Sequence, residues 1–458
     1  MVCSAGVRNR IDRFLGSPYY VLLAAALSLV AHILSAELFA YTIFTAVVIY
    51  LGIWGADLLP LTPLLLFCYI LPSATNNPGK NESSIFSGAQ GLWVLGLGLF
   101  MLCSLAVFLF RKRKEFFALR RRLLPGMLAL CAAYLLSGLG SEAYPHFLKQ
   151  NLLYCFLQCL CLVLPYLLLT GGICWKNARK DYLGWVGVCG GSLILLQLCW
   201  RYLTGGVIVD GAIVRTNIFT GWGMYNNMGA MLGMMLPFAF SLGMYHKKSW
   251  AGLLCAGVFL AGIFLTCSRA GILAGSLIFC LCLLLMLCYT QNKKRIFLLL
   301  AVLFGVFLAA GILMWDKLLQ LFSDLIRRGL DPTTRDEIYA EGWKLFLKEP
   351  VFGNSFFSPG YVPWDFSTVD AFSSLIPPRW CNTIVQLLVS AGIVGMVAYL
   401  VHRVDTLVFF LKRRNRENWF ILCSICVLLI TSLLDCHFFN LGPVLFYSAS
   451  LAFAECQQ

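Results

Sequence analysis

The stretch GLWVLGLGLFMLCSLAVFLF at residues 91–110, followed at once by RKRK at 111–114, decides the fold class of this chain. A helix needs roughly 20 mostly apolar residues to cross about 30 Å of hydrocarbon, and this run has that length. In lipid the backbone has to satisfy its polar groups within its own segment, which a helix does. The run is therefore predicted to be a transmembrane helix that ends at a basic cluster.

The same kind of run recurs along the chain. The other apolar runs lie at 18–35, 37–54, 57–72, 123–140, 150–171, 182–203, 222–245, 250–266, 270–290, 296–315, 382–402, 418–434 and 438–454. The composition agrees, with 60% hydrophobic residues, 12% charged residues and a mean hydropathy of +0.81, whereas about a quarter of the residues in soluble domains are charged. Because the first three and the last two runs are crowded, we predict an all-α polytopic membrane protein with about 12–14 transmembrane helices.

Basic residues alternate between the loops and thereby assign the two sides of the membrane. Lys and Arg accumulate in cytoplasmic loops. The predicted cytoplasmic clusters are Arg8, Arg10 and Arg13; 111–114 and 120–122; Lys176, Arg179 and Lys180; Lys247 and Lys248; 293–295; and Arg403, 412–414 and Arg416. Both termini are thus expected inside, and the first run is expected to be an anchor rather than a removed signal peptide.

The net charge of +14 is mainly this topology signal. Attraction to anionic membrane lipids is a secondary effect, and no nucleic-acid partner is predicted. Most of the 20 cysteines lie within apolar runs, where a Cys side chain behaves as a small hydrophobe. The sequence shows no cysteine pattern with metal-site spacing, no Walker loop, no HExxH and no dinucleotide fingerprint, so we predict neither a metal nor a cofactor.

Two arginines, Arg215 and Arg269, lie at the ends of apolar runs on the predicted outer side, where basic residues are sparse. Arg215 leads into TGWGMYNNMGA at 220–230, and Arg269 lies in TCSRAG at 266–271. A guanidinium presents planar donors that match phosphate oxygens in a bidentate way, although an arginine at a helix end also extends to the interface without any ligand. Two of them beside Gly- and Asn-rich turns favour an anion site. The neighbouring polar candidates for substrate binding are Asn226, Asn227 and Ser268.

The predicted outer segment 316–381 is the longest connection, and its length predicts a small external subdomain. Part of it, 336–348, has the pattern of an amphipathic helix that Pro350 and Gly353 end. The stretch 354–378 is rich in aromatic residues with a few acids, among them Trp364, Asp365 and Asp370. Such a stretch serves either as a sugar-binding surface or as aromatic packing at the headgroup level. The expected organisation is N-terminal transmembrane helices at 1–203, core helices at 204–315, the external subdomain at 316–381 and C-terminal helices at 382–458.

Four motifs in this order resemble the O-antigen ligase and polymerase superfamily, over about residues 210–400. They are the run 215–230, the SRAG turn at 268–271, the segment 335–353 that ends in EPVFG, and WCN at 380–382 followed by QLLVSAGIVG at 386–395. The resemblance implies a metal-independent glycosyltransferase in the bacterial cytoplasmic membrane, with its active face external. It would take a glycan from an undecaprenyl pyrophosphate carrier and attach it to the hydroxyl of a glycan or lipid-glycan acceptor, as a polymerase or a ligase.

The resemblance also implies roles for individual residues. Arg215 and Arg269 match the arginines that hold the carrier's pyrophosphate, and Arg335 matches the basic residue that opens the loop helix. The family's histidine falls on Cys381, whose thiol is a poor base because an unperturbed Cys pKa is about 8.5. The residues that remain open as the base are Glu337, Glu341, Asp365, Asp370 and Asp435, the last with His437 close in sequence, although that pair also fits a plain turn. Arg379, two residues before Cys381, and Asn382, directly after it, complete the predicted substrate-binding residues.

Two other functions use the same features. In a flippase or transporter of lipid-linked oligosaccharides, the arginines would bind the substrate's phosphates during passage, but transporters usually show internal repeats, and this sequence shows no matching halves. A peptidoglycan-type glycan polymerase would use a similar donor and differ in substrate. The large external segment serves a reaction on one side of the membrane, so the enzyme is the preferred hypothesis.

Overall fold

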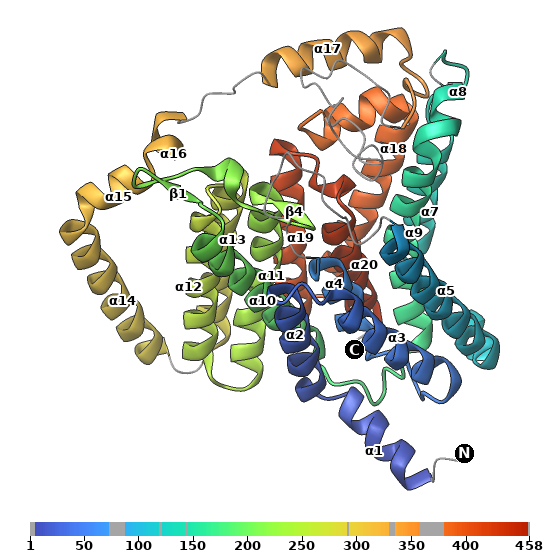
Figure 1. The fold of residues 1–458 in the computed structure, drawn as a ribbon, viewed down its shortest axis with the longest axis horizontal. Coiled ribbons are helices and arrows are strands. Elements are labelled where there is room, and N and C mark those ends of the chain that lie inside the picture. Colours follow the sequence, from blue (N-terminus) through green and yellow to red (C-terminus); the bar gives the residue numbers. More distant parts are fainter. Residues whose placement is uncertain are drawn as a thin grey trace. The chain divides into compact units, whose positions relative to one another are not determined.

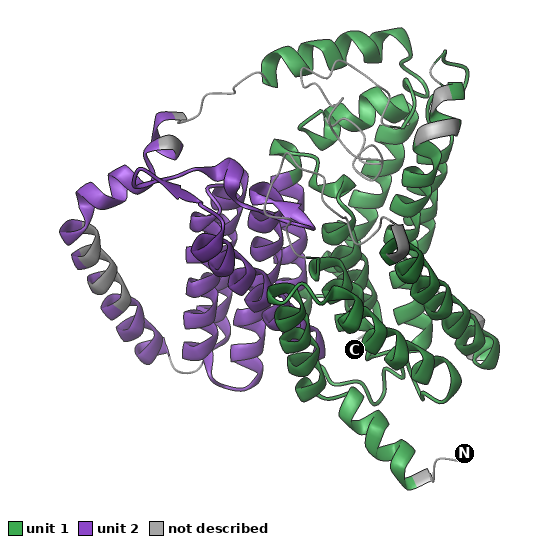
Figure 2. Ribbon diagram, viewed as in Figure 1, with its two compact units in different colours: residues 1–180, 332–418, 432–458 green, residues 181–331, 419–431 purple. Residues whose placement is uncertain are grey.

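The computed structural model describes residues 5–72, 88–118, 121–142, 144–290, 293–328, 335–356 and 380–456. These residues are almost entirely helical, with two short β-hairpins (Figure 1). The predicted all-α membrane class is therefore confirmed. The chain divides into two compact units: unit 1 comprises 1–180, 332–418 and 432–458, and unit 2 comprises 181–331 and 419–431 (Figure 2).

Seven helices among the described residues are long and apolar enough to cross a membrane. They are α5 (Gly88–Arg111), α9 (Leu152–Gly172), α10 (Tyr182–Thr204), α11 (Tyr225–Tyr245), α13 (Arg269–Tyr289), α18 (Thr383–Lys412) and α19 (Arg416–Leu434). An eighth span results if α1 (Ala5–Leu15) and α2 (Pro18–Ile33), which meet at a bend of 66°, count as one. Five apolar helices are shorter: α3 (Glu37–Ile53), α4 (Leu61–Ile70), α7 (Leu124–Leu135), α12 (Ser249–Leu265) and α20 (Leu441–Cys456).

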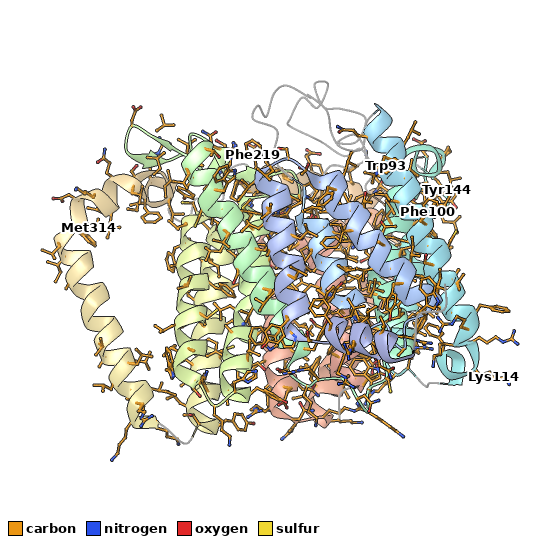
Figure 3. All side chains as sticks on the ribbon, turned by 60° about the horizontal axis from the view of Figure 1, so that its bottom comes forward. Trp93, Phe100, Lys114, Tyr144, Phe219 and Met314 are labelled. Atoms are coloured by element: carbon orange, nitrogen blue, oxygen red, sulfur yellow. The ribbon has the colours of Figure 1, made fainter. Side chains whose placement is uncertain are left out.

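Helix α5 has large apolar side chains exposed on its surface, as expected for a helix in contact with lipid. Trp93 and Phe100 extend outward from this helix (Figure 3) and are 56% and 63% exposed. Lys114 lies just beyond the other end of the helix. A continuous exposed apolar face is unfavourable in water and favourable against acyl chains.

Two predicted spans are shorter than their apolar runs. The run 57–72 forms a helix of only 10 residues, α4, and the run 123–140 forms one of 12, α7. At 1.5 Å per residue these helices measure about 15 and 18 Å, which is less than the hydrocarbon thickness. Helix α7 ends where Gly138 and Gly140 adopt positive φ values of 73° and 88°.

One residue assigned to a cytoplasmic loop lies elsewhere. Helix α18 continues past the predicted end at 402 to Lys412, so Arg403 is part of the helix. Its guanidinium lies 4.7, 4.0 and 4.9 Å from the ring centres of Tyr399, Phe438 and Tyr447. These aromatic faces stabilise the positive charge within unit 1 by cation–π interaction. The prediction was wrong because the apolar run ends at the arginine, whereas the helix does not.

Helices α9 and α20 pack together in unit 1 through an inserted hydroxyl group. Ser448 Oγ donates to Leu162 O at 2.7 Å and accepts from Tyr166 N at 3.0 Å, so it replaces one i→i−4 bond of α9 beside Pro165. Such an insertion is one of the recognised causes of a helix bend.

The smaller elements of this unit are α6 (Arg113–Ala118), α8 (Tyr144–His146), a π-helix η1 (Phe147–Asn151), α17 (Arg335–Lys348) and the 3₁₀ turn η4 (His437–Phe439).

Helix α18 is broken at Gly392, where φ is 62° and ψ is −156°. At the break, Ile393 N donates to Pro350 O at 2.9 Å and Val394 N donates to Val351 O at 3.2 Å. One turn earlier, Asn354 N donates to Val389 O at 2.7 Å. The backbone that follows α17 therefore takes the place of the missing helical hydrogen bonds of α18.

Helix α11 forms the core of unit 2, since 83% of the residues in its most apolar stretch are buried. Its small residues permit close approach: a Cβ on Gly243 would lie 2.7 Å from Gly252 Cα in α12, and a Cβ on Gly233 would lie 2.8 Å from Val427 in α19. Small residues at such crossings are typical of membrane helices. The other elements are hairpin β1–β2 (Ile208–Val209, Ala212–Ile213), the 3₁₀ turn η2 (Arg215–Asn217), hairpin β3–β4 (Phe219–Thr220, Gly223–Met224), α14 (Lys293–Leu313), α15 (Trp315–Leu321) and α16 (Ser323–Arg328).

We predict that Gly392→Ala strongly destabilises the protein. The φ and ψ values of Gly392 lie in a region that only glycine adopts readily, with a strain of about 1–3 kcal/mol for other residues. A Cβ there would also lie 2.4 Å from Val351 O. Thermal unfolding of the purified protein in detergent measures the effect. Gly98→Ala in α5 is the matched control, because a Cβ at Gly98 meets nothing within 4 Å. Equal stability of the two variants would contradict the prediction.

Candidate functional site

Arg215 and Arg269 line the same pocket in unit 2. The other lining residues are Ile213, Cys267, Leu321, Phe322 and Leu325. The two guanidinium groups that the sequence singled out thus lie together, although 53 positions separate them along the chain. The pocket combines two cations with an apolar wall.

Backbone hydrogen bonds hold the chain on both sides of Arg215. Val214 N donates to Val207 O at 2.8 Å, and Ile218 N donates to Arg215 O at 2.9 Å. The guanidinium lies 5.1 Å from the ring centre of Tyr225, the first residue of α11. Its Nε is buried and has no hydrogen-bond partner among the residues that the structure describes. A buried donor in this condition has unused capacity for an anion.

Arg269 is the first residue of α13, so it lies at the end of the helix where the dipole is positive. The turn before it is sharp: Cys267 has a φ of 53°, and Ser268 is the N-cap, whose Oγ accepts from Gly271 N at 3.2 Å. A helix N-terminus with an arginine favours negative charge at this point. The SRAG motif is therefore a capped helix start that presents a cation.

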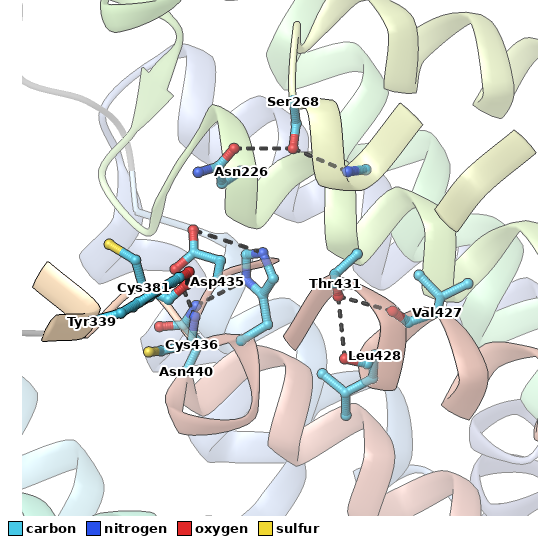
Figure 4. Close-up of polar contacts among 12 residues, drawn as sticks. Asn226, Ser268, Tyr339, Cys381, Val427, Leu428, Thr431, Asp435, Cys436 and Asn440 are labelled. Atoms are coloured by element: carbon cyan, nitrogen blue, oxygen red, sulfur yellow. Dashed lines mark hydrogen bonds and ion pairs between the residues drawn. The ribbon is translucent and has the colours of Figure 1, made fainter. Parts of the chain in front are cut away.

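The Asn-rich turn and the SRAG turn are in direct contact. Ser268 Oγ donates to Asn226 Oδ1 at 3.0 Å (Figure 4). Behind this bond the helices α11 and α13 approach closely, since a Cβ on Gly271 would lie 3.1 Å from Gly229 Cα. The glycines of both motifs thus permit a close helix crossing that holds the two turns together. Asn227 is half-buried beside Asn226 at the start of α11.

The apolar wall of the pocket comes from α15 and α16, which the sequence assigned only to the start of the external segment. Gln320 Nε2 donates to Asp210 O at 3.2 Å in the turn of hairpin β1–β2. Gly211 in that turn leaves room for this contact, since a Cβ there would lie 2.5 Å from Gln320 Nε2. In this arrangement the pocket has no space for a water-sized group. The α15–α16 segment therefore closes the pocket.

A third arginine, Arg201, which was not among the predicted site residues, organises the loop of unit 2 that follows α10. It is buried at the end of α10, where its Nε donates to Asn217 O at 2.9 Å and its guanidinium lies 4.2 Å from the ring centre of Phe219. Asn217 Nδ2 donates to Gly206 O at 3.0 Å. Its position in the last turn of an apolar run was the available signal, since the predicted span ended at 203 and enclosed it.

The residues around Cys381 form a separate polar cluster in unit 1. Tyr339 on α17 donates its OH to Cys381 O at 3.2 Å (Figure 4), and burial raises the pKa of Tyr339. Asn382 caps α18, with Oδ1 accepting from Ile384 N at 2.8 Å, and its Nδ2 donates to Leu433 O at 2.8 Å. Cys381 itself has a φ of 52°.

Asp435 and His437 belong to this cluster and lie at the turn between α19 and α20. His437 Nε2 lies 4.0 Å from Asp435 Oδ2, and Asn440 Nδ2 lies 3.2 Å from His437 Nδ1. The side chain of His437 is fully buried, whereas that of Asp435 is 18% exposed. Figure 4 shows Asp435 with Cys381 and Tyr339. The carboxylate is thus the accessible member of an acid–imidazole pair beside the position of the family's histidine.

The remaining predicted site residues differ in their placement. Arg335 is half-buried at the start of α17, and Glu337 is exposed on the same helix. Glu341 Oε1 accepts from Lys344 Nζ at 2.7 Å in a surface ion pair. Four predicted residues lie outside the described part of the chain: Trp364, Asp365, Asp370 and Arg379.

The fold and the pocket define a class of protein: a polytopic helical membrane protein whose helix ends carry a two-arginine pocket beside an apolar wall. Within that class, residues 254–400 match the family described as O-antigen ligase. The resemblance to this superfamily is therefore confirmed over residues 254–400, which include the SRAG turn and the two later motifs but not the run 215–230. It supports a membrane ligase or polymerase of surface polysaccharide. No curated protein matches the chain.

Proposed function

We propose that this protein is an O-antigen ligase-like glycosyltransferase, which moves a glycan from an undecaprenyl pyrophosphate carrier to an acceptor hydroxyl. The observation that carries the proposal is the pocket that Arg215 and Arg269 share with apolar residues of α15 and α16. The proposed setting is the outer face of the bacterial cytoplasmic membrane, with both termini cytoplasmic. The product is a surface polysaccharide, made by polymerisation or by ligation.

The pocket suits a diphosphate because two planar guanidinium groups offer paired donors to two phosphate groups. The N-terminus of α13 adds a positive dipole at the same place. These charges take the role that a divalent cation has in many phosphate sites, so the proposed reaction is metal-independent.

The apolar wall suits the lipid part of the donor. Leu321, Phe322 and Leu325 lie in the pocket with the two arginines. A polyprenyl diphosphate carries hydrocarbon directly next to its phosphates, and contact with these side chains removes both from water. A soluble nucleotide sugar would offer a polar nucleoside in that place and would lose this contribution.

The reaction is a displacement at the anomeric carbon. The acceptor oxygen forms a bond to this carbon, the bond from the carbon to the diphosphate oxygen breaks, and the electron pair leaves with the diphosphate. Preorganised cations in a partly desolvated pocket stabilise the negative charge that develops on the leaving group. With α15–α16 in this position the pocket has no space for the donor, so the segment has to move aside for the donor to bind. Its contact with the bound donor then excludes water, which would otherwise compete as an acceptor.

For the acceptor proton we propose Asp435 as the general base. Cys436 N donates to Asp435 Oδ1 at 2.6 Å and so positions the carboxylate, and His437 Nε2 lies 4.0 Å from Asp435 Oδ2. By the resemblance, Cys381 stands where the family has a histidine, and Asp435 and His437 lie in the same cluster of unit 1 as Cys381. Asp435 is the member of the pair that reaches solvent, so its carboxylate has access to a hydroxyl.

We predict that Arg215→Ala and Arg269→Ala each lower glycan transfer by about 10²–10³-fold, since each removes a cation at the developing charge. Arg→Lys variants should recover only part of the rate because an ammonium group cannot form the bidentate pair. The measurement is the release of undecaprenyl pyrophosphate from lipid-linked glycan by purified protein, which occurs only when the glycosyl bond breaks and so also separates an enzyme from a transporter. Lys317→Ala, an exposed cation outside the pocket, is the control. Normal transfer by either Ala variant would refute the proposed anion site.

We predict that Gln320→Ala opens the pocket more often. Loss of a hydrogen bond of about 1 kcal/mol corresponds to about a fivefold larger open population. Cys267 is buried in the closed pocket, so its labelling by a hydrophilic maleimide, followed by peptide mass spectrometry, reports the opening. Lys317→Ala again serves as the control. An unchanged labelling rate in Gln320→Ala would show that this contact does not close the pocket.

We predict that Asp435→Asn lowers the transfer rate by at least about 10²-fold while donor binding is kept, as expected for loss of a general base. His437→Asn should lower the rate less. Restoring the family's histidine with Cys381→His should recover part of the rate lost in Asp435→Asn. Glu337→Gln is the control among the acids on α17. If Glu337→Gln loses the activity and Asp435→Asn keeps it, the base lies on α17 instead.

A further inference from the structure

Unit 1 contains a second pocket, with a volume of about 290 Å³, that the proposed reaction does not use. Three segments meet there: the bend between α1 and α2, the turn between α3 and α4, and the loop 177–179. The charge pattern predicts that all three lie on the cytoplasmic side, opposite the proposed active face. The pocket is small for an oligosaccharide and suits a ligand the size of a lipid headgroup.

The pocket carries charges of both signs. Asp12 and Asp57 line it together with Arg13 and Arg179. Asp12 is held in place by Tyr50, whose OH donates to Asp12 Oδ1 at 2.9 Å, and Arg8 Nε lies 4.0 Å from Asp12 Oδ2. A ligand with one anionic and one cationic group would match this arrangement, because each of its charges would find opposite charges in the lining.

Asp57 is the residue that most clearly favours a cationic group. Its Oδ1 accepts from Leu59 N at 2.9 Å, and burial raises the pKa of Asp57. A carboxylate that burial disfavours in its charged form is stabilised by a cation at hydrogen-bond distance. The pocket thereby offers a place for a primary ammonium group.

The surroundings have the character of a membrane interface. Helix α1 carries Arg8, Arg10 and Arg13 and meets α2 at a bend of 66°, as expected for a helix that lies along the interface before the chain enters the membrane. Exposed aromatic residues flank the bend: Phe14 is 44% exposed and Tyr19 is 74% exposed. Aromatic side chains of this kind lie at the headgroup level.

We propose that this pocket binds the headgroup of a zwitterionic phospholipid that carries a primary amine, of the phosphatidylethanolamine type. Its phosphate binds Arg13 and Arg179, and its ammonium group binds Asp12 and Asp57. An anionic headgroup such as phosphatidylglycerol lacks a cation for the two carboxylates. A choline headgroup has the cation but no N–H to donate. The bound lipid would link the α1–α2 bend to the α3–α4 turn.

The test measures lipid binding to the purified full-length protein by native mass spectrometry, with phosphatidylethanolamine, phosphatidylcholine and phosphatidylglycerol of identical acyl chains. We expect retention of the ethanolamine lipid about tenfold above the other two, since charge-assisted hydrogen bonds contribute about 1.5–3 kcal/mol. Soluble glycerophosphoethanolamine should compete only at much higher concentration, because it lacks the acyl chains. Equal competition would mean that the site takes the free headgroup compound and not the lipid.

Matched variants separate this pocket from general membrane attraction. Arg13→Gln and Arg179→Gln should weaken binding of the ethanolamine lipid about tenfold, whereas Arg10→Gln and Lys176→Gln, whose residues do not line the pocket, should not. Asp12→Asn with Asp57→Asn should abolish the preference for ethanolamine over glycerol headgroups. Asn keeps an Oδ1 acceptor for Leu59 N, so the turn is retained. Equal retention of all three lipids by the native protein, equal losses in the Arg10 and Lys176 controls, or a co-purified peptide in the pocket would overturn the proposal.

Discussion

The break of α18 at Gly392 is the constraint on which the arrangement of unit 1 depends. A helix interrupted inside a membrane leaves amide groups that no water can satisfy, and each would cost several kcal/mol. Here Pro350 O and Val351 O accept the amides of Ile393 and Val394. The chain after α17 is therefore docked against α18 by backbone hydrogen bonds that do not depend on side-chain identity. Glycine is required at the break because its φ and ψ values exclude other residues.

This docking explains why two separate motifs of the sequence occur together. The segment that ends in Gly353 supplies the carbonyl groups, and the segment around Gly392 supplies the amides. The same contact holds α17 next to the start of α18, where Tyr339 reaches Cys381 O. In unit 2 the relation is similar in kind, because Gly229 and Gly271 allow the Asn-rich turn and the SRAG turn to meet. In both units glycines permit two backbone segments to approach closely. This approach brings the polar or cationic side chains of the neighbouring turns together.

Hydropathy and charge alone predicted the all-α membrane class and most helix positions, because long apolar runs have one stable backbone form in lipid. They failed where a helix ends inside an apolar run, as α7 does before Gly138, and where a charge lies inside a helix, as Arg403 does. That Arg215 and Arg269 lie in one pocket was predictable in kind, since the charge pattern predicts both at ends of apolar runs on the same side of the membrane. The closure of this pocket by Leu321 and Phe322 was not predictable. It depends on the tertiary packing of a segment whose apolar residues show no strong helical periodicity.

A comparison of three arginines supports the two-arginine pocket as the proposed anion site. Arg403 is enclosed by three aromatic rings, and Arg201 donates to Asn217 O and lies on Phe219. Their charges are stabilised within the protein. Arg215 lies near a single ring at 5.1 Å, and it shares a pocket with a second cation. Two like charges in one partly desolvated pocket repel each other, so the arrangement is stabilised by an anion that binds both. In the proposed reaction a lipid diphosphate supplies that charge, and its departure as the leaving group is the step that the same charges would favour.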